Sequence, residues 1–184
     1  NSASASAQGG RSSSIPARRR SGVIRAGRTE TITCRRRLLV ATVKHVAVEA
    51  HLGERFKIES TIGSHTLIVD QPKTAGGEDA GPTPLEYFLL SLAGCTGTIA
   101  RIAAKQKRIT LRSMDVRVEG DLDVEGLLGR NPEAPVGFSG ITVTVKMDAD
   151  MSREEKEAFA HEVDRRCPVS ANIHDATPVK LVVE

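Results

Sequence analysis

Residues 83–107 read TPLEYFLLSLAGCTGTIARIAAKQK, and this stretch predicts the helix around which the rest of the chain folds. Thr83 is placed as the N-cap, Pro84 as the first helical residue, and Glu86 three residues after the cap, which completes a capping box. Downstream, apolar side chains recur at steps of three and four residues, as on one face of a helix. This face consists of Leu85, Phe88, Leu89, Leu92, Cys95, Ile99, Ile102 and Ala103. The pattern continues to about Lys107, where we expect the helix to end.

The segments on both sides of this helix show either the alternation of apolar and polar residues or the Val-rich composition that is typical of strands. Six segments are predicted as strands: 38–50, 56–60, 65–69, 111–123, 141–147 and 179–183. Gly63-Ser64 provides a tight turn between the second and the third of them. Two stretches rich in Gly and Pro, 71–84 and 126–140, are predicted as loops.

A second helix is predicted to begin at Ser152, since Glu155 follows it at the spacing of a capping box. It ends at Cys167, because Pro168 cannot continue a helix and restricts the residue before it. A short turn, 170–174, comes next. The order of strands, long helix, strands, second helix and final strand predicts an α+β fold. In it, a largely antiparallel sheet packs on the long central helix.

The central helix is apolar around more of its circumference than one chain of this size can cover, so we expect a homodimer that buries it. The chain has 184 residues, of which 39% are hydrophobic. This is enough for one domain of ordinary size, which we place at 38–184. Residues 1–37 contain nine Arg and one Glu, a net charge of +8, whereas the other 147 residues carry −5.

The basic extension 1–37 is rich in Ser, Arg, Ala and Gly and has no hydrophobic period, so we predict that it is disordered. A Ser/Arg-rich, acid-poor leader also resembles an organellar transit peptide. Its Arg runs at 18–20 and 35–37 leave contact with nucleic acid or anionic lipid open. Cys34 lies within the extension, and we interpret it as incidental.

The composition argues against several classes of function. Only 3% of the residues are aromatic and none is Trp, so we expect no stacking platform for nucleic-acid bases. No run of 18 apolar residues occurs, so we expect no transmembrane helix, no membrane partner and a cytoplasmic protein. No glycine-rich phosphate-binding motif is present, and His161, Cys167 and His174 lack the spacing of a zinc site. We therefore expect no cofactor and no metal.

Two cysteines carry the candidate chemistry. Cys95 lies in the middle of the apolar helix and Cys167 at the end of the second helix, each on the apolar face. Each of them alone is more simply explained as a small buried hydrophobe. As a pair they could meet in the core, where one thiolate would attack a peroxide O–O bond and the other thiol would close a disulfide.

A reactive thiolate needs a nearby cation, and Cys95 is too far along its helix to gain much from the helix dipole. Arg55 is the candidate cation, because it opens the predicted strand 56–60. Arg101 is predicted on the opposite face of the helix from Cys95. Glu86 is explained by its capping role, and its alternative role is to orient the activating arginine.

Several motifs together resemble the OsmC/Ohr family of thiol-dependent peroxidases. Near the first cysteine they are VDQP at 69–72, GGEDAGPTPLE at 76–86 and SLAGC at 91–95. Near the second cysteine they are RCPVS at 166–170 and TPV at 177–179. The likeness covers residues 43–184 and is closer to the OsmC-like branch than to Ohr itself.

The resemblance implies an intertwined α+β homodimer whose active sites lie at the subunit interface. It implies that Cys95 is the peroxidatic cysteine and that Cys167 resolves it. In the Ohr branch an Arg and a Glu assist the thiolate, and Arg55 is the nearest match for the Arg. Leu85 occupies the position of the family's Glu, and Glu86 follows it.

The implied activity is the reduction of organic hydroperoxides, with hydrogen peroxide as a further candidate substrate. Electrons would come from a small dithiol or a dithiol protein, and no bound cofactor is implied. Two alternatives stay open. One is a non-catalytic OsmC-like dimer that senses redox state or binds a ligand. The other is an RNA- or membrane-associated protein recruited by its Arg-rich extension.

Overall fold

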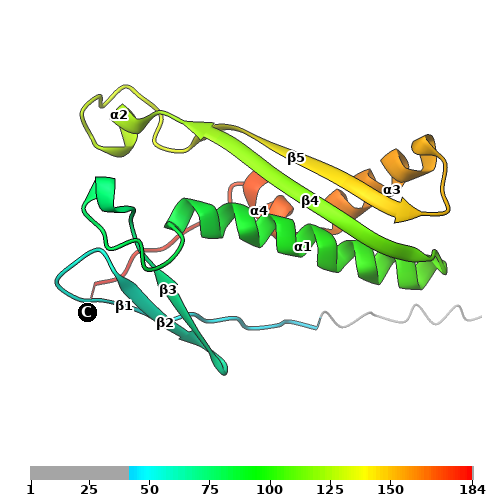
Figure 1. The fold of residues 1–184 in the computed structure, drawn as a ribbon, viewed down its shortest axis with the longest axis horizontal. Coiled ribbons are helices and arrows are strands. Elements are labelled where there is room, and N and C mark those ends of the chain that lie inside the picture. The colour runs from blue at the N-terminus through cyan, green and yellow to red at the C-terminus, as the bar shows by residue number, and fades with distance from the viewer. Residues whose placement is uncertain (1–41, 184) are drawn as a thin grey trace, which may run out of the picture. The chain divides into compact units, whose positions relative to one another are not determined.

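The structure is a computed structural model that describes residues 42–183. The basic extension 1–37 and the first residues of the predicted strand 38–50 lie outside the described residues. From His45 onward the chain forms one structural unit. All of the described helices and strands belong to this unit (Figure 1).

Three short strands form an antiparallel sheet in the order β1 (Ala50–Leu52), β2 (Ile58–Ile62) and β3 (His65–Val69). Gly63 turns the chain between β2 and β3 with a φ of +61°, a left-handed conformation that glycine adopts at little cost. This is the turn that the sequence predicted. The loop after β3 contains one short 3-10 helix, η1 (Lys73–Ala75).

β4 (Leu111–Leu122) and β5 (Phe138–Ala149) pair as a long antiparallel hairpin. Val116 lies opposite Val145 in this pair, so the predicted alternation places apolar residues across from one another. β5 extends beyond the predicted segment 141–147 at both ends, because β4 is long enough to pair with the additional residues.

α1 (Pro84–Lys107) has the predicted bounds. The Glu86 N–H donates to Thr83 Oγ1 at 3.3 Å and the Glu86 carboxylate accepts the Thr83 N–H at 2.7 Å, so the predicted capping box is present. α1 packs on β4 and also contacts α3 (Arg153–Arg166) and α4 (Pro168–His174). It therefore joins the hairpin to the two C-terminal helices (Figure 1).

The core lies where α1, β4, β5 and α3 meet. Its members are mostly small or aliphatic, as expected for a chain with few aromatic residues: Ala100, Ala103, Ala104, Leu111, Ala149, Phe159 and Val163. Because the α1 members are all alanines, neighbouring elements can approach this helix closely. The packing fixes the position of α3, and with it the position of the residue that follows α3.

Two predicted strands are largely absent from the part of the chain that the structure describes, apart from Ala50, which begins β1. Residues 42–49 have no regular structure before β1, and 179–183 has none either. Both segments expose apolar side chains, such as Val46 at 70% and Leu181 at 88%. A strand forms only where a neighbouring strand satisfies its backbone groups. Within residues 42–183, neither segment pairs with another strand.

Three predicted boundaries also differ from the observed ones. The predicted strand 56–60 is shifted by two residues and is observed as β2, Ile58–Ile62. The predicted loop 126–140 overlaps α2 (Val124–Leu127) and the start of β5. The predicted turn 170–174 is part of α4. Side-chain caps explain the two helices that the sequence analysis missed. The Asp123 carboxylate accepts the Glu125 N–H at the start of α2, and Cys167 caps α4.

α1 is the one helix within residues 42–183 that is long and apolar enough to cross a membrane. The sequence did not predict this, because no run of 18 consecutive apolar residues occurs. The central helix of a protein core meets the same two criteria, so this finding is weak evidence for a membrane span. Only 28% of the most apolar 18-residue stretch of α1 is buried by the part of the chain that the structure describes.

Candidate functional site

Cys95 and Cys167 meet where α1 passes the junction between α3 and α4. The Cys167 thiol donates to Cys95 Sγ, and the two sulfur atoms are 2.7 Å apart. Both residues are free cysteines. Cys167 is 1% exposed, whereas Cys95 is only partly buried. The sequence analysis expected both side chains to point at one core, and the structure brings them together.

The local sequence explains the position of Cys167. Phe159, Val163 and Cys167 follow one another at four-residue steps and are all buried, so they form one packed face. Pro168 cannot continue the helix, and Cys167 takes an extended conformation with φ −80° and ψ 112°. Cys167 therefore ends α3 and also caps α4, where its Sγ accepts the Ser170 N–H at 3.4 Å.

Cys95 has small neighbours on α1. At Gly94 and Gly97, no atom beyond the adjacent residues and the nearby backbone of α1 lies within 4 Å of the place where a Cβ would stand. The helix surface on both sides of Cys95 is therefore open in the single chain. A small molecule can reach the sulfur of Cys95 more easily than the enclosed sulfur of Cys167.

Burial raises the pKa of the Cys95 thiol, and the hydrogen-bonded thiol of Cys167 raises it further. A hydrogen bond from the Val169 N–H, in the first turn of α4, lowers the same pKa. Within residues 42–183, no Lys, Arg or His side chain forms a hydrogen bond with either sulfur. The described part of the chain thus places no hydrogen-bonded cation at either sulfur, although a reactive thiolate needs one nearby.

Arg55 and Glu86 do not contact each other in the structure. Arg55, in the loop between β1 and β2, pairs with Glu78 at 2.8 Å, and 76% of the arginine side chain is exposed. The Glu86 carboxylate accepts the Thr83 N–H and hydroxyl at 2.7 and 2.8 Å, and these bonds lower its pKa. Capping therefore accounts for Glu86, and Glu78 is a partner of Arg55 that the sequence analysis missed.

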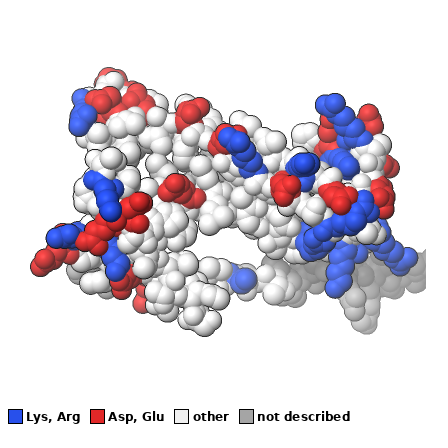
Figure 2. Space-filling model, viewed as in Figure 1, with Lys and Arg blue, Asp and Glu red and all other residues white. Residues whose placement is uncertain are grey.

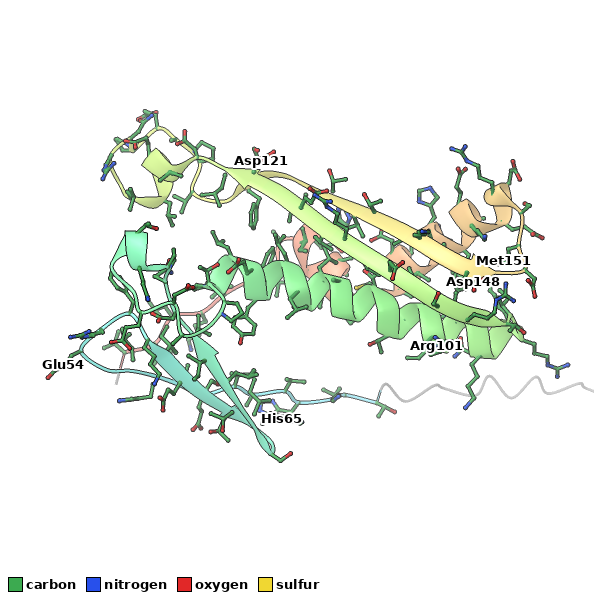
Figure 3. The ribbon with its side chains drawn as sticks, viewed as in Figure 1. Glu54, His65, Arg101, Asp121, Asp148 and Met151 are labelled. Atoms are coloured by element: carbon green, nitrogen blue, oxygen red, sulfur yellow. The ribbon has the colours of Figure 1, made fainter. Side chains whose placement is uncertain are left out.

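Two other arginines near α1 are bound elsewhere. Arg101 donates to the Leu111 carbonyl at the start of β4 (Figure 3). Arg166 donates to Gln106 at 2.8 Å and pairs with Glu162 at 3.4 Å. The bond to Gln106 ties the end of α3 to the end of α1. Both guanidinium groups therefore support the packing around the cysteines without contacting a sulfur.

Glu78 is held by a loop that is built on a buried carboxylate. Asp70, 1% exposed, accepts the N–H of Gln71 at 2.8 Å and those of Glu78 and Ala80 at 3.0 Å. These hydrogen bonds, that from Ala80 first, hold the pKa of Asp70 below its ordinary value. A Cβ at Gly77 would lie 1.9 Å from the Gln71 carbonyl oxygen, so only glycine fits. The run GGEDAG was the available signal, but it was interpreted as a loop and as a family motif, not as a support for Glu78.

Two cavities with mostly apolar walls lie between the β4–β5 hairpin and the C-terminal helices; near neighbours of the cysteines in the sequence line them, but neither cysteine does. The larger, of 230 Å³, is lined on α1 by Leu92, one turn before Cys95. The smaller, of 190 Å³, is lined on α1 by Thr96, the residue after Cys95. Asp164 lines both of them. These cavities could hold the alkyl part of a small substrate.

A larger hollow of 450 Å³ includes neither cysteine. Most of its lining residues are charged or ionisable: His51, Gly53, Glu54, Arg55, Lys57, Glu59 and Glu78. Figure 2 shows charged side chains around this region and around α3, with fewer of them on the surface in between. No group of three or more His, Cys, Asp or Glu residues within 42–183 could hold a metal ion.

Comparison with known proteins gives a family match and similar solved structures. The family model OsmC, described as OsmC-like protein, matches residues 76–182, a range that includes both cysteines. An OsmC-like protein from Mycoplasma pneumoniae is 24% identical with a TM-score of 0.63, over 72% of this chain and 89% of that one. The organic hydroperoxide resistance protein OsmC from Legionella pneumophila is 25% identical with a TM-score of 0.56, over 72% and 91%. A search of curated proteins gives no match.

Proposed function

Because this chain belongs to the OsmC-like family, we propose that it reduces organic hydroperoxides with Cys95 and Cys167. The observation that carries this proposal is the 2.7 Å separation of the two sulfur atoms. Two further facts support it: the two cavities lined by near neighbours of the cysteines in the sequence have mostly apolar walls, and the similar protein from Legionella pneumophila is an organic hydroperoxide resistance protein.

In the proposed reaction the Cys95 thiolate attacks the O–O bond of the hydroperoxide. The S–O bond forms as the O–O bond breaks, and the products are a Cys95 sulfenic acid and an alcohol. Cys167 then attacks the sulfenic sulfur, water leaves, and a Cys95–Cys167 disulfide forms. An external dithiol supplies two electrons by thiol–disulfide exchange and restores both thiols.

Exposure supports this assignment of roles. Cys95 is partly exposed beside open space, so a substrate can reach it, whereas Cys167 is enclosed and in contact with Cys95. Cys167 also lies at a helix end, and a helix end can shift more easily than the middle of α1. The accessible thiol of Cys95 therefore attacks, and the enclosed thiol of Cys167 resolves.

The cation for Cys95 is proposed to be Arg55, oriented by Glu78. Arg55 is largely exposed and its ion pair lies at the surface, so the guanidinium is free to be covered by a second subunit. Glu86 is the alternative carboxylate, but it could bind Arg55 only by giving up its hydrogen bonds to Thr83.

A homodimer is part of the proposal. α1 exposes Phe88 at 40%, Leu90 at 60% and Ile102 at 42%. The apolar segments 45–49 and 179–183 also lack a pairing strand within the described chain. A second copy would cover both features at once, and it would bring further charged residues to Cys95.

The test is steady-state consumption of cumene hydroperoxide with dithiothreitol, in a Cys34→Ser background that leaves only the two candidate thiols. We expect turnover in the background protein and none in Cys95→Ser. With Cys167→Ser assayed without dithiothreitol, which would itself reduce a sulfenic acid, we expect a single turnover that ends with oxidised Cys95. The second candidate function, a redox-sensing dimer, is favoured by the raised pKa of Cys95. It predicts slow oxidation of the pair without sustained consumption.

A further inference from the structure

The first turn of α4 contacts both sulfur atoms of the candidate site. The Val169 backbone N–H lowers the pKa of the Cys95 thiol, and the next N–H along the chain, that of Ser170, donates to Cys167 Sγ at 3.4 Å. A small displacement of this turn would therefore change the surroundings of both sulfurs at the same time. The position of α4 relative to α3 is accordingly part of the chemistry of the pair.

One side-chain hydrogen bond holds this turn to α3. Ser170, 4% exposed, donates from Oγ to Asp164 Oδ1 at 2.5 Å. Asp164 lies three residues before Cys167 and Ser170 three residues after it, so this bond spans the corner between the two helices. Pro168 has no N–H, so the corner lacks a backbone hydrogen bond that a continuous helix would form. The hydroxyl–carboxylate bond reinforces the corner where the backbone is weakest.

We propose that Ser170 and Asp164 form a positioning pair that holds the first turn of α4 against the two sulfur atoms. This pair thereby sets the rate at which Cys167 attacks a Cys95 sulfenic acid. This inference rests on the proposed function. In the attack, the Cys167 sulfur bonds to the Cys95 sulfur and the S–O bond breaks. The hydroxyl then leaves with the Cys167 thiol proton as water.

A purely structural role for this hydrogen bond makes a different prediction. It would stabilise the folded protein without affecting the sulfurs, so its loss would lower the melting temperature and leave the disulfide step unchanged. A positioning role requires that the disulfide step slows and that a side chain with the same hydrogen-bonding capacity restores it.

The first experiment compares three variants of α3 in the Cys34→Ser background. Asp164→Ala removes the acceptor at an exposed position, so the fold should persist, whereas Asp164→Asn keeps an acceptor oxygen. Glu157→Ala is the matched control, because Glu157 is exposed on the same helix and pairs only with Arg153 at 3.0 Å. After a single addition of cumene hydroperoxide, thiol labelling and mass spectrometry follow sulfenic acid and disulfide over time.

With Asp164→Ala we expect disulfide formation to slow by at least about fivefold, the order expected for losing one hydrogen bond to a charged group. Oxidation of Cys95 itself should change less. Asp164→Asn should stay within about twofold of the background protein, and Glu157→Ala should match it. Disulfide formation by folded Asp164→Ala at the background rate would overturn the proposal, as would equal slowing in Asp164→Ala and Asp164→Asn.

A second measurement needs no peroxide. Equilibration with glutathione redox buffers reports the ratio of dithiol to disulfide for the Cys95–Cys167 couple. Asp164→Ala should shift this ratio toward the dithiol by about fivefold, because a loosened corner holds the two thiols together less well. An unchanged ratio would contradict the positioning role. If the background protein consumes no hydroperoxide, the proposed function fails, and this ratio alone decides the inference.

Discussion

Val163 is the core residue on which the position of Cys167 depends most directly. It lies one turn before Cys167 in α3, is 0% exposed, and belongs to the cluster that joins α1, β4, β5 and α3. Val163→Ala removes two carbon atoms from this site. At about 0.8 kcal/mol per buried methylene plus a cavity contribution, the loss of unfolding free energy is about 2–3 kcal/mol. In a domain of this size that corresponds to a fall of about 5–10 °C in Tm.

The assay is urea unfolding of the reduced protein at a fixed concentration, followed by circular dichroism. Val136→Ala is the matched control, since Val136 is 64% exposed, and it should change the unfolding free energy by less than about 0.5 kcal/mol. Val163→Ala should also slow disulfide formation, because α3 would hold Cys167 less firmly against α1. The reasoning is refuted if Val163→Ala and Val136→Ala have the same stability.

Three further predictions concern the assembly, the arginine and the extension. Sedimentation should show a dimer at micromolar concentration, because α1 and two apolar segments are uncovered in the single chain; a stable, fully folded monomer would contradict this. Since burial raises the pKa of Cys95, Arg55→Gln should move the pH profile of Cys95 alkylation to higher pH than that of the wild type. Identical pH profiles would remove Arg55 from the mechanism. Deleting residues 1–37 should leave Tm and thiol reactivity unchanged, and a large drop in Tm would show that the extension packs on the domain.

Features encoded within a few residues could be predicted from the sequence. The bounds of α1 follow from the capping box of Thr83 and Glu86 and from the apolar period that continues to Lys107. The start of α3 follows from the same kind of box, and its end follows from Pro168. The alternation in β4 and β5 is equally local, because each strand finds its partner within one hairpin.

The predicted strands at 38–50 and 179–183 show where local patterns are insufficient. Their composition is that of strands, but a strand forms only beside a partner. Within the described part of these two segments, only Ala50 is paired, as the first residue of β1. The pattern of residues indicates that a segment can form a strand. It does not indicate whether the strand with which it pairs belongs to the same chain.

The candidate site divides in a similar way. Both cysteines could be identified from their helix faces, but their separation depends on how α1 and α3 pack, which no local pattern gives. The Arg55–Glu78 pair was missed because it depends on a loop folded around Asp70. The hydrogen bond between Ser170 and Asp164 spans a helix corner that was predicted as a turn.

The most direct test of the account is mass spectrometry of the protein after a single equivalent of cumene hydroperoxide. The account predicts an intramolecular Cys95–Cys167 disulfide in the wild type. In Cys167→Ser it predicts a sulfenic acid or a more highly oxidised form on Cys95. Formation of sulfenic acid on Cys167 in Cys95→Ser, at the rate at which the wild type is oxidised, would contradict it by reversing the roles of the two thiols.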